Sequence, residues 1–232
     1  MKILKLIGFV VLFGCILSTD LLASNIQINQ IQTQKKTMIL NHLENNDLIS
    51  SEIKKLGDKK EDVLCLALNM YHEARGSTIE DQIATTYVVF NRLEDKNYPL
   101  FYPKNEKSIC NIVFDRYQFC WTNDEYIKKP REIEIWNNIQ KLAYELYINP
   151  VHKERAKSFK MKHYVLSTML PMDNKPKWID NRTVTAKIGK HSYMLLGKEK
   201  IIESEYYQTI IKKTYNEIFI RDIKNDSRNK NI

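Results

Sequence analysis

The sequence predicts a mainly α-helical fold built around one hydrophobic core. Three stretches place apolar residues at helical spacing, over residues 61–76, 77–93 and about 199–222. The chain has 232 residues, of which 43% are hydrophobic, and this is enough for one globular domain with extensions at either end. We therefore expect a single folded domain rather than two large ones.

The first 24 residues have the pattern of a secretory signal. Lys2 and Lys5 precede an apolar run over residues 6–17, and small residues follow near Ala23 and Ser24. The run is shorter than the roughly 20 apolar residues of a membrane span. A retained signal-anchor would show the same pattern, and lipidation at Cys15 is a further alternative. We expect export to the periplasm, envelope or medium, with membrane contact only through this segment.

The rest of the chain divides by composition. Residues 25–60 are a polar lead-in with a weak helical pattern. Residues 61–198 hold all three tryptophans and most of the glycines and prolines, which marks the folded domain. Residues 199–232 predict a helix followed by a polar, disordered tail. Mixed charges, including Glu203 and Glu205, favour docking of this helix on its own domain.

The stretch YHEARG lies where the first two predicted helices of the domain meet. The first helix ends at Gly76, and Ser77 and Glu80 form the S-x-x-E pattern of a capping box that opens the second. Glu73 then falls in the last turn of the first helix, where the helix dipole favours a protonated carboxyl. Burial would raise its pKa further, as a general acid requires. A solvated surface glutamate is the alternative interpretation.

Three cysteines remain if the signal is removed, in a compartment where disulfides persist. Cys110 and Cys120 flank a short segment, and we expect them to pair. Cys65 sits among helical apolar residues and is expected to be a small buried apolar residue. His72 and Glu73 lack the second histidine of an HExxH zinc motif, so we expect neither a metal nor a cofactor.

Several blocks occur in the order typical of one family. ALNMYHEARGSTIEDQIATTYVVFNRL is followed by SICNIVFDRYQFCW, HYVLSTMLPMDNKPKW and KIGKHSYML. Over roughly residues 63–197 this set resembles the SleB-type (spore cortex-lytic) cell wall hydrolase family. The resemblance implies a mostly helical, lysozyme-like catalytic domain with a small β element, which cleaves the glycan strands of peptidoglycan with Glu73 as its acid. The chain departs from the family pattern at Ser77, at Cys120, and at His163 and Tyr164, where relatives often have the reverse order.

A single carboxyl group is consistent with a lytic transglycosylase. In that reaction the C6 hydroxyl of muramic acid attacks its own anomeric carbon, and one group acts first as acid and then as base. A hydrolytic glycosidase would need a second carboxylate, for which Asp115 and Asp124 are candidates. A non-catalytic wall-binding protein is a further alternative.

The residues expected around this acid are mostly aromatic or amide side chains, which stack on sugar rings and bond their hydroxyls. We expect Gln118, Trp121, Tyr164 and Trp178 to line the saccharide groove. Core packing is the alternative for each aromatic, and more so for Tyr164 than for the two tryptophans. Asn91 and Arg92 are expected to support the site, and His191 to be a hydrogen-bonded histidine near a final strand.

The formal net charge of +8 draws the protein toward polyanions. The chain has no interleaved basic and aromatic stretch of the kind that binds single-stranded nucleic acid, and the export signal argues further against that partner. We expect peptidoglycan as the partner and a monomeric protein.

Overall fold

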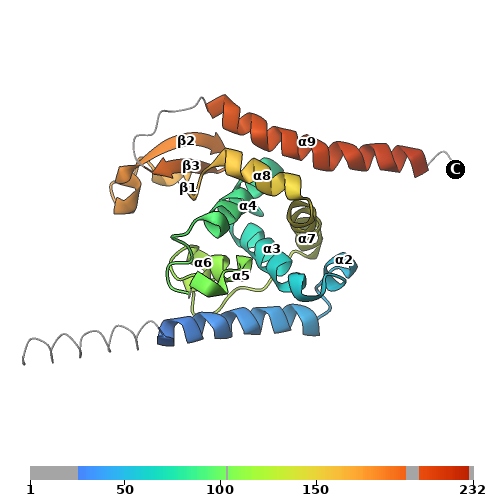
Figure 1. Cartoon of the computed structure of the whole chain (residues 1–232), viewed down its shortest axis with the longest axis horizontal. Coiled ribbons are helices and arrows are strands. Elements are labelled where there is room, and N and C mark those ends of the chain that lie inside the picture. Colours follow the sequence, from blue (N-terminus) through green and yellow to red (C-terminus); the bar gives the residue numbers. More distant parts are fainter. Residues whose placement is uncertain (1–25, 103, 197–203, 230–232) are drawn as a thin grey trace, which may run out of the picture.

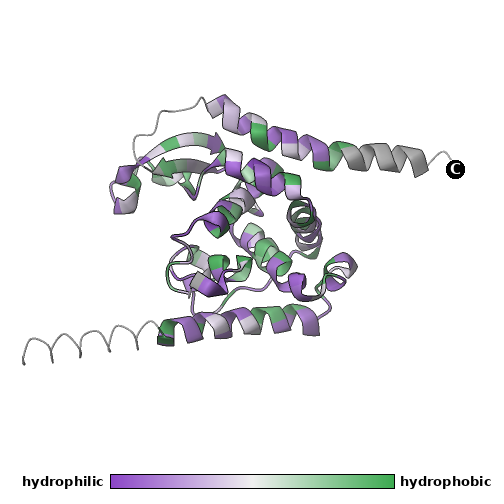
Figure 2. Cartoon of the chain, in the orientation of Figure 1, coloured by the Kyte–Doolittle hydropathy of each residue, from purple (hydrophilic) through white to green (hydrophobic). Residues whose placement is uncertain are grey.

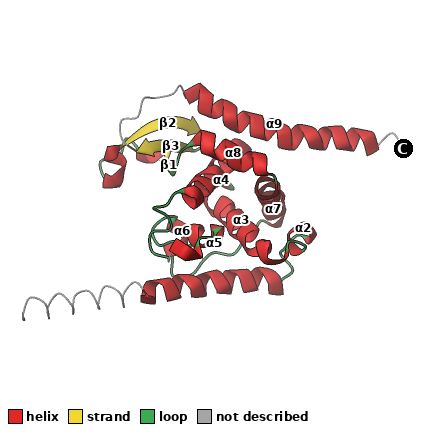
Figure 3. Ribbon diagram, viewed as in Figure 1, coloured by secondary structure: helices red, strands yellow, loops and turns green. Residues whose placement is uncertain are grey.

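The computed structural model describes residues 26–102, 104–196 and 204–229 (Figure 1). The predicted signal or anchor and Cys15 lie outside these residues. The described part is mainly helical, with one small antiparallel sheet, as the sequence predicts (Figure 3). No helix in the described part is long and apolar enough to cross a membrane.

Helix α3 (Lys60–Ala74) is the centre of the core. Its residues from Val63 to Met70 are all buried, because α4 (Ile79–Glu94), α5 (Ile109–Val113) and α7 (Ile133–Ile148) pack around it. A helix that is apolar on nearly every side is expected to be enclosed in this way. Figure 2 shows its hydrophobic colour against the more polar outer helices. The other short helices are α2 (Ser51–Lys54), α6 (Cys120–Asn123) and α8 (Pro150–Phe159), with single 3-10 turns at Gly57–Lys59, Lys104–Glu106, Ser167–Met169 and Lys177–Asn181.

The corner between α3 and α4 differs in one detail from the predicted capping box. Thr78, not Ser77, caps α4, and its hydroxyl accepts from the Asp81 backbone N–H at 3.3 Å. The Ser77 hydroxyl instead donates to the Asp81 carboxylate. Gln82 closes the corner by donating from Nε2 to the Ala74 carbonyl at 3.3 Å. The capping-box prediction was wrong because a buried carboxylate competes for Ser77.

The sheet has the strand order β1–β3–β2, with all pairs antiparallel. Its strands are β1 (His163–Leu166), β2 (Arg182–Ile188) and β3 (His191–Leu196). Tyr164 of β1 pairs with Tyr193 of β3, and Ile188 pairs with His191 across the two-residue turn that joins β2 and β3. The sheet packs against α4 and α9 (Ser204–Asn229), which brings β1 and β3 to the helical corner.

Helices at either end of the described chain pack on opposite sides of the core (Figure 1). Residues 26–45 are helical and bury Ile39 and Leu43. Lys35 in this helix donates to the backbone carbonyl of Asp124 at 2.6 Å. Helix α9 buries Tyr207 and Ile211 against the domain.

The disulfide joins Cys65 to Cys110, and the predicted pairing of Cys110 with Cys120 was wrong. Cys65 on α3 and Cys110 on α5 are both buried where these two helices pack. Cys120 begins α6 with an exposed, free thiol. Proximity along the chain was therefore a poor guide, because α5 turns Cys110 toward the core and away from Cys120.

Candidate active site

Glu73 lies in the last turn of α3, as predicted, and its side chain is partly buried. Burial raises the pKa of its carboxyl. Three groups act in the opposite direction and lower it: Tyr164 from β1, His191 from β3 and Arg92 from α4. Burial is the larger effect, so the protonated form of Glu73 is favoured relative to an exposed glutamate. The site therefore holds an acid next to groups that stabilise its anion.

Tyr164 is the aromatic residue that the structure places against Glu73. Its hydroxyl interacts with the Glu73 carboxyl but has no hydrogen bond of good geometry within the described residues. Its ring meets the His191 ring edge-on at 4.9 Å between centroids. Burial raises the pKa of Tyr164 well above its ordinary value, so the hydroxyl stays protonated and able to donate.

Arg92 and Asn91 hold the segment that precedes β1 against α4. Asn91 Nδ2 donates to the Met161 carbonyl at 3.1 Å, and Arg92 Nε donates to the Lys162 carbonyl at 2.8 Å. The Arg92 guanidinium is buried 4.8 Å from the centroid of Phe119. These contacts place Tyr164 opposite Glu73, and the α3–α4 corner itself is braced by Gln82.

A buried network behind Tyr164 was not predicted from the sequence. Asp81, which is 0% exposed, accepts from His191 Nδ1 at 2.9 Å and from the Tyr193 hydroxyl at 2.6 Å. The Lys190 backbone N–H donates to the same carboxylate at 3.1 Å. The expectation that His191 is a hydrogen-bonded histidine is confirmed by these contacts. Asp81 thereby holds the imidazole that packs on Tyr164.

The turn between β2 and β3 requires glycine for this network to form. Gly189 has φ +54, and a Cβ there would lie 2.4 Å from Ser77 Oγ and 2.7 Å from Asp81 Cβ. Only glycine adopts this backbone conformation readily and lets the turn approach α4 so closely. The IGKH block is therefore explained by packing of the turn on the first residues of α4.

The remaining predicted groove residues lie at different depths. Trp121 is buried at 8% exposure, donates to Asn69 Oδ1 at 3.2 Å and stacks on His72 at 4.4 Å. Gln118 is partly buried, and its amide contacts only the nearby Arg116 carbonyl, at 3.5 Å. Trp121 therefore packs mainly against the core, with part of its ring at a pocket, and no hydrogen bond joins Gln118 to Glu73 among the described residues.

Trp178 is 39% exposed on the 3-10 turn before β2. The Arg182 guanidinium lies 4.9 Å from its ring, and the His163 ring lies 5.9 Å away. His163 in turn contacts Arg182 at 3.2 Å, and burial, with Arg92 and Arg182 adding to it, lowers the pKa of His163 to about 3. The Trp178 ring therefore presents an accessible aromatic face beside β1 and packs on Arg182 and His163.

Asp115 and Asp124, the two candidates for a second catalytic carboxylate, differ in their exposure to solvent. Asp115 is fully buried and accepts from the backbone N–H groups of Leu100 and Phe101, at 2.5 and 2.9 Å. Asp124 is exposed; burial, followed by the charges of Glu73 and Asp124, raises the pKa of the Cys120 thiol. Of the two, only Asp124 is accessible to solvent. Among the described residues no cluster of three or more histidine, cysteine, aspartate or glutamate side chains has the geometry of a metal site.

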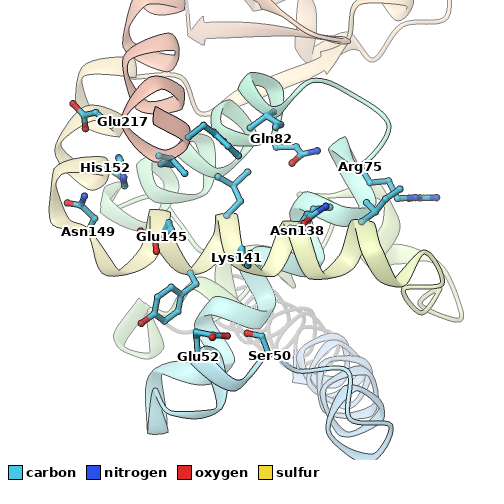
Figure 4. Close-up of a pocket in the computed structure, with 17 residues that line it drawn as sticks. Ser50, Glu52, Arg75, Gln82, Asn138, Lys141, Glu145, Asn149, His152 and Glu217 are labelled. Atoms are coloured by element: carbon cyan, nitrogen blue, oxygen red, sulfur yellow. The ribbon is translucent and has the colours of Figure 1, made fainter. Parts of the chain in front are cut away.

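Two pockets lie near these elements without including Glu73. Figure 4 shows a pocket of about 750 Å³ between α2, α7 and α9, with Arg75 and Gln82 at the end near the corner. A second pocket, of about 450 Å³, is lined by Tyr71, His72 and Trp121 and by the loop after α6. Both pockets border the α3–α4 corner, on which Glu73 lies.

Several residues of the site escaped the sequence interpretation. An aspartate in the first turn of a helix is common, so the sequence around Asp81 gave no sign of its contact with His191. Cys120 was wrongly expected to form a disulfide. The alternation of His191 and Tyr193 in the final strand was the available signal, because residues two apart in a strand share one face. That pattern indicated a shared partner but not its identity.

Comparison with known proteins agrees with the resemblance. Residues 76–194 match the family described as Cell Wall Hydrolase, and Glu73 lies just before the matched stretch. No curated protein and no solved structure matches the chain. The family match covers just over half of the 232 residues. The chain therefore belongs to the Cell Wall Hydrolase family, whose activity is directed at peptidoglycan.

Proposed function

We propose that this enzyme cleaves the glycan strands of peptidoglycan as a lytic transglycosylase, with Glu73 as its acid and then its base. The observation that carries the proposal is the environment of Glu73. Burial raises the pKa of this carboxyl, while Tyr164, Arg92 and His191 face it and favour its anion. A group that must donate a proton and later accept one needs both features.

The reaction needs no group other than Glu73 for proton transfer. Protonated Glu73 donates to the glycosidic oxygen as the bond from that oxygen to the anomeric carbon of muramic acid breaks. The C6 hydroxyl of the same sugar attacks the anomeric carbon, and the Glu73 carboxylate accepts the proton that this hydroxyl releases. The product is a 1,6-anhydro ring, and Glu73 returns to its protonated state.

The neighbours of Glu73 have supporting roles in this scheme. The Tyr164 hydroxyl and the Arg92 guanidinium stabilise the carboxylate that forms when the proton leaves. Asp81 orients His191 behind Tyr164. Trp178 offers an accessible face on which a sugar ring further along the strand can stack.

Hydrolysis by two carboxylates is the second candidate, and the position of Asp124 is the observation that favours it. Asp124 is exposed, and its charge raises the pKa values of His72 and Cys120. His72 precedes Glu73 in the chain, and Cys120 precedes Trp121. Retaining glycosidases place the two carboxyl groups about 5 to 5.5 Å apart, and inverting ones about 6.5 to 9.5 Å apart. Asp81 and Asp115 are excluded from this role because both are buried and engaged by several donors.

The test is mass spectrometry of the fragments released from purified peptidoglycan by the parent protein, Glu73→Gln and Asp124→Asn. We expect anhydro-muramic ends from the parent and from Asp124→Asn, and no release by Glu73→Gln. Reducing muramic ends, with loss of activity in both variants, would establish hydrolysis by two carboxylates. If the folded parent protein binds the wall and releases nothing, the protein is a wall-binding one.

A further inference from the structure

The loop after α6 closes the pocket of about 450 Å³ against the turn of α3 that also carries the proposed acid. Its lining comes from the end of α3, from α6 and from the loop, namely Tyr71, His72, Arg75, Trp121, Asp124, Lys128, Lys129, Arg131 and Glu132. His72 precedes Glu73 in the chain, and Trp121 follows Cys120, whose thiol lies in the field of the Glu73 carboxylate. The volume falls within the range of about 300 to 1,000 Å³ that small-ligand sites occupy.

The charges that line this pocket are unevenly matched. Four cationic side chains face two carboxylates. Glu132 is already engaged, because the Tyr71 hydroxyl donates to it and Arg75 Nε lies 3.6 Å from its Oε1. Within the described chain Lys128, Lys129 and Arg131 make no ion pair and are exposed. The pocket therefore presents unpaired positive charge to an incoming ligand.

The inner wall of the pocket is aromatic. The His72 and Trp121 rings stack at 4.4 Å with 17° between their planes, and Tyr71 meets His72 edge-on at 5.5 Å. His72 Nε2 is buried and makes no hydrogen bond of good geometry among the described residues, although the Lys128 backbone lies close enough to the His72 side chain to raise its pKa slightly. Burial, followed by the Arg75 charge, lowers the pKa of His72 to about 4, so its ring is neutral at physiological pH. This wall suits small apolar groups next to a polar one.

The loop is held at both ends, so the pocket is formed before any ligand arrives. At its start, Lys35 donates to the carbonyls of Thr122 and Asp124 at 3.2 and 2.6 Å. At its end, the Tyr71 hydroxyl accepts from the backbone N–H of Arg131 at 3.0 Å. A preformed site loses less conformational entropy when it binds. The helix of residues 26–45 thus supports one wall of the pocket.

We infer that this pocket binds the carboxylates of the peptide stem that muramic acid carries, while the glycan strand lies across Glu73. This inference rests on the proposed function, and it adds that the enzyme recognises the peptide stem as well as the glycan strand. Peptide stems bring free carboxylates for Lys128, Lys129 and Arg131 and methyl side chains for the stacked rings. They also branch from the sugar at which the proposed cleavage occurs, which matches the position of the pocket at the turn of α3 that carries Glu73. A phosphate polymer of the wall would match the charge but not the aromatic wall.

The test measures binding in the Glu73→Gln background, so that it does not depend on catalysis. Soluble glycan strands that carry stem peptides, and the same strands stripped of peptides by an amidase, are titrated by calorimetry. We expect the stem-bearing strands to bind more tightly. Lys128→Gln combined with Lys129→Gln should weaken their binding by about 2- to 30-fold, the range for two exposed charge pairs. Amidase treatment leaves one lactyl carboxylate on each muramic acid, close to the sugar ring, so the affinity for stripped strands should fall by a smaller factor than the affinity for stem-bearing strands.

The matched control is Lys212→Gln combined with Lys213→Gln, which removes the same charge from exposed positions on α9, on the other side of the core. An equal loss in this control would show a net-charge effect and overturn the inference. So would equal affinity for both kinds of strand, or tighter binding of a purified teichoic acid than of stem-bearing strands. If stem binding behaves as expected but the parent protein cleaves no strand, the proposed function fails and the pocket assignment stands.

Discussion

Removal of the Cys65–Cys110 disulfide tests the fold at the point where the structure corrected the sequence prediction. The two cysteines are 45 residues apart. In the chain-entropy treatment of cross-links, a loop of this length stabilises the native state by about 4 kcal/mol at 25 °C. At about 2 to 4 °C per kcal/mol for a chain of this size, the double variant Cys65→Ala with Cys110→Ala should melt about 8 to 16 °C lower.

The assay is thermal unfolding followed by tryptophan fluorescence, because Trp136 is fully buried beside α3. Cys120→Ala is the control, and its midpoint should equal that of the parent protein since this thiol is free. Alkylation without reductant should label Cys120 and spare Cys65 and Cys110. The reasoning is refuted if Cys120→Ala is destabilised as much as the double variant, or if Cys65 is labelled in the folded protein.

Two further predictions concern the site itself. Burial raises the pKa of Glu73 above its ordinary value of 4.5, so the native state binds this proton more tightly and loses stability as the pH rises between the unfolded and folded values. Glu73→Gln should therefore gain stability relative to the parent as the pH rises from about 4.5 through the raised pKa of the folded protein. Urea midpoints of both proteins measure this, and a difference that does not change with pH would contradict the buried acid. Asp81→Asn should cost about 1.5 to 3 kcal/mol for each hydrogen bond to the carboxylate that it weakens, because buried Asp81 accepts from His191 and Tyr193. The fraction that folds should clear peptidoglycan with a lower kcat and an unchanged KM, whereas Ser77→Ala, which removes one hydroxyl from the same network, should act nearly as the parent. A raised KM with normal kcat would show that Asp81 does not position the catalytic groups.

Much of the helical framework could be predicted from the sequence. The apolar spacing of α3 and the polar residues that open α4 place the two helices and their corner within a few residues, and Glu73 falls in the last turn of α3 as expected. These features depend on neighbours three or four positions away, which the sequence displays directly. The family match is likewise a property of the order of residues.

Only the tertiary structure decided which groups surround that acid. Asp81 and His191 are 110 positions apart, and Lys35 reaches the Asp124 carbonyl across 89. The disulfide partner of Cys110 and the approach of Tyr164 to Glu73 depend in the same way on how separate elements pack. Helix periodicity states which face of an element is buried, but not which other element covers it. The sequence by itself therefore determined the helices and the acid at their corner, and the packing of distant elements determined the environment of that acid.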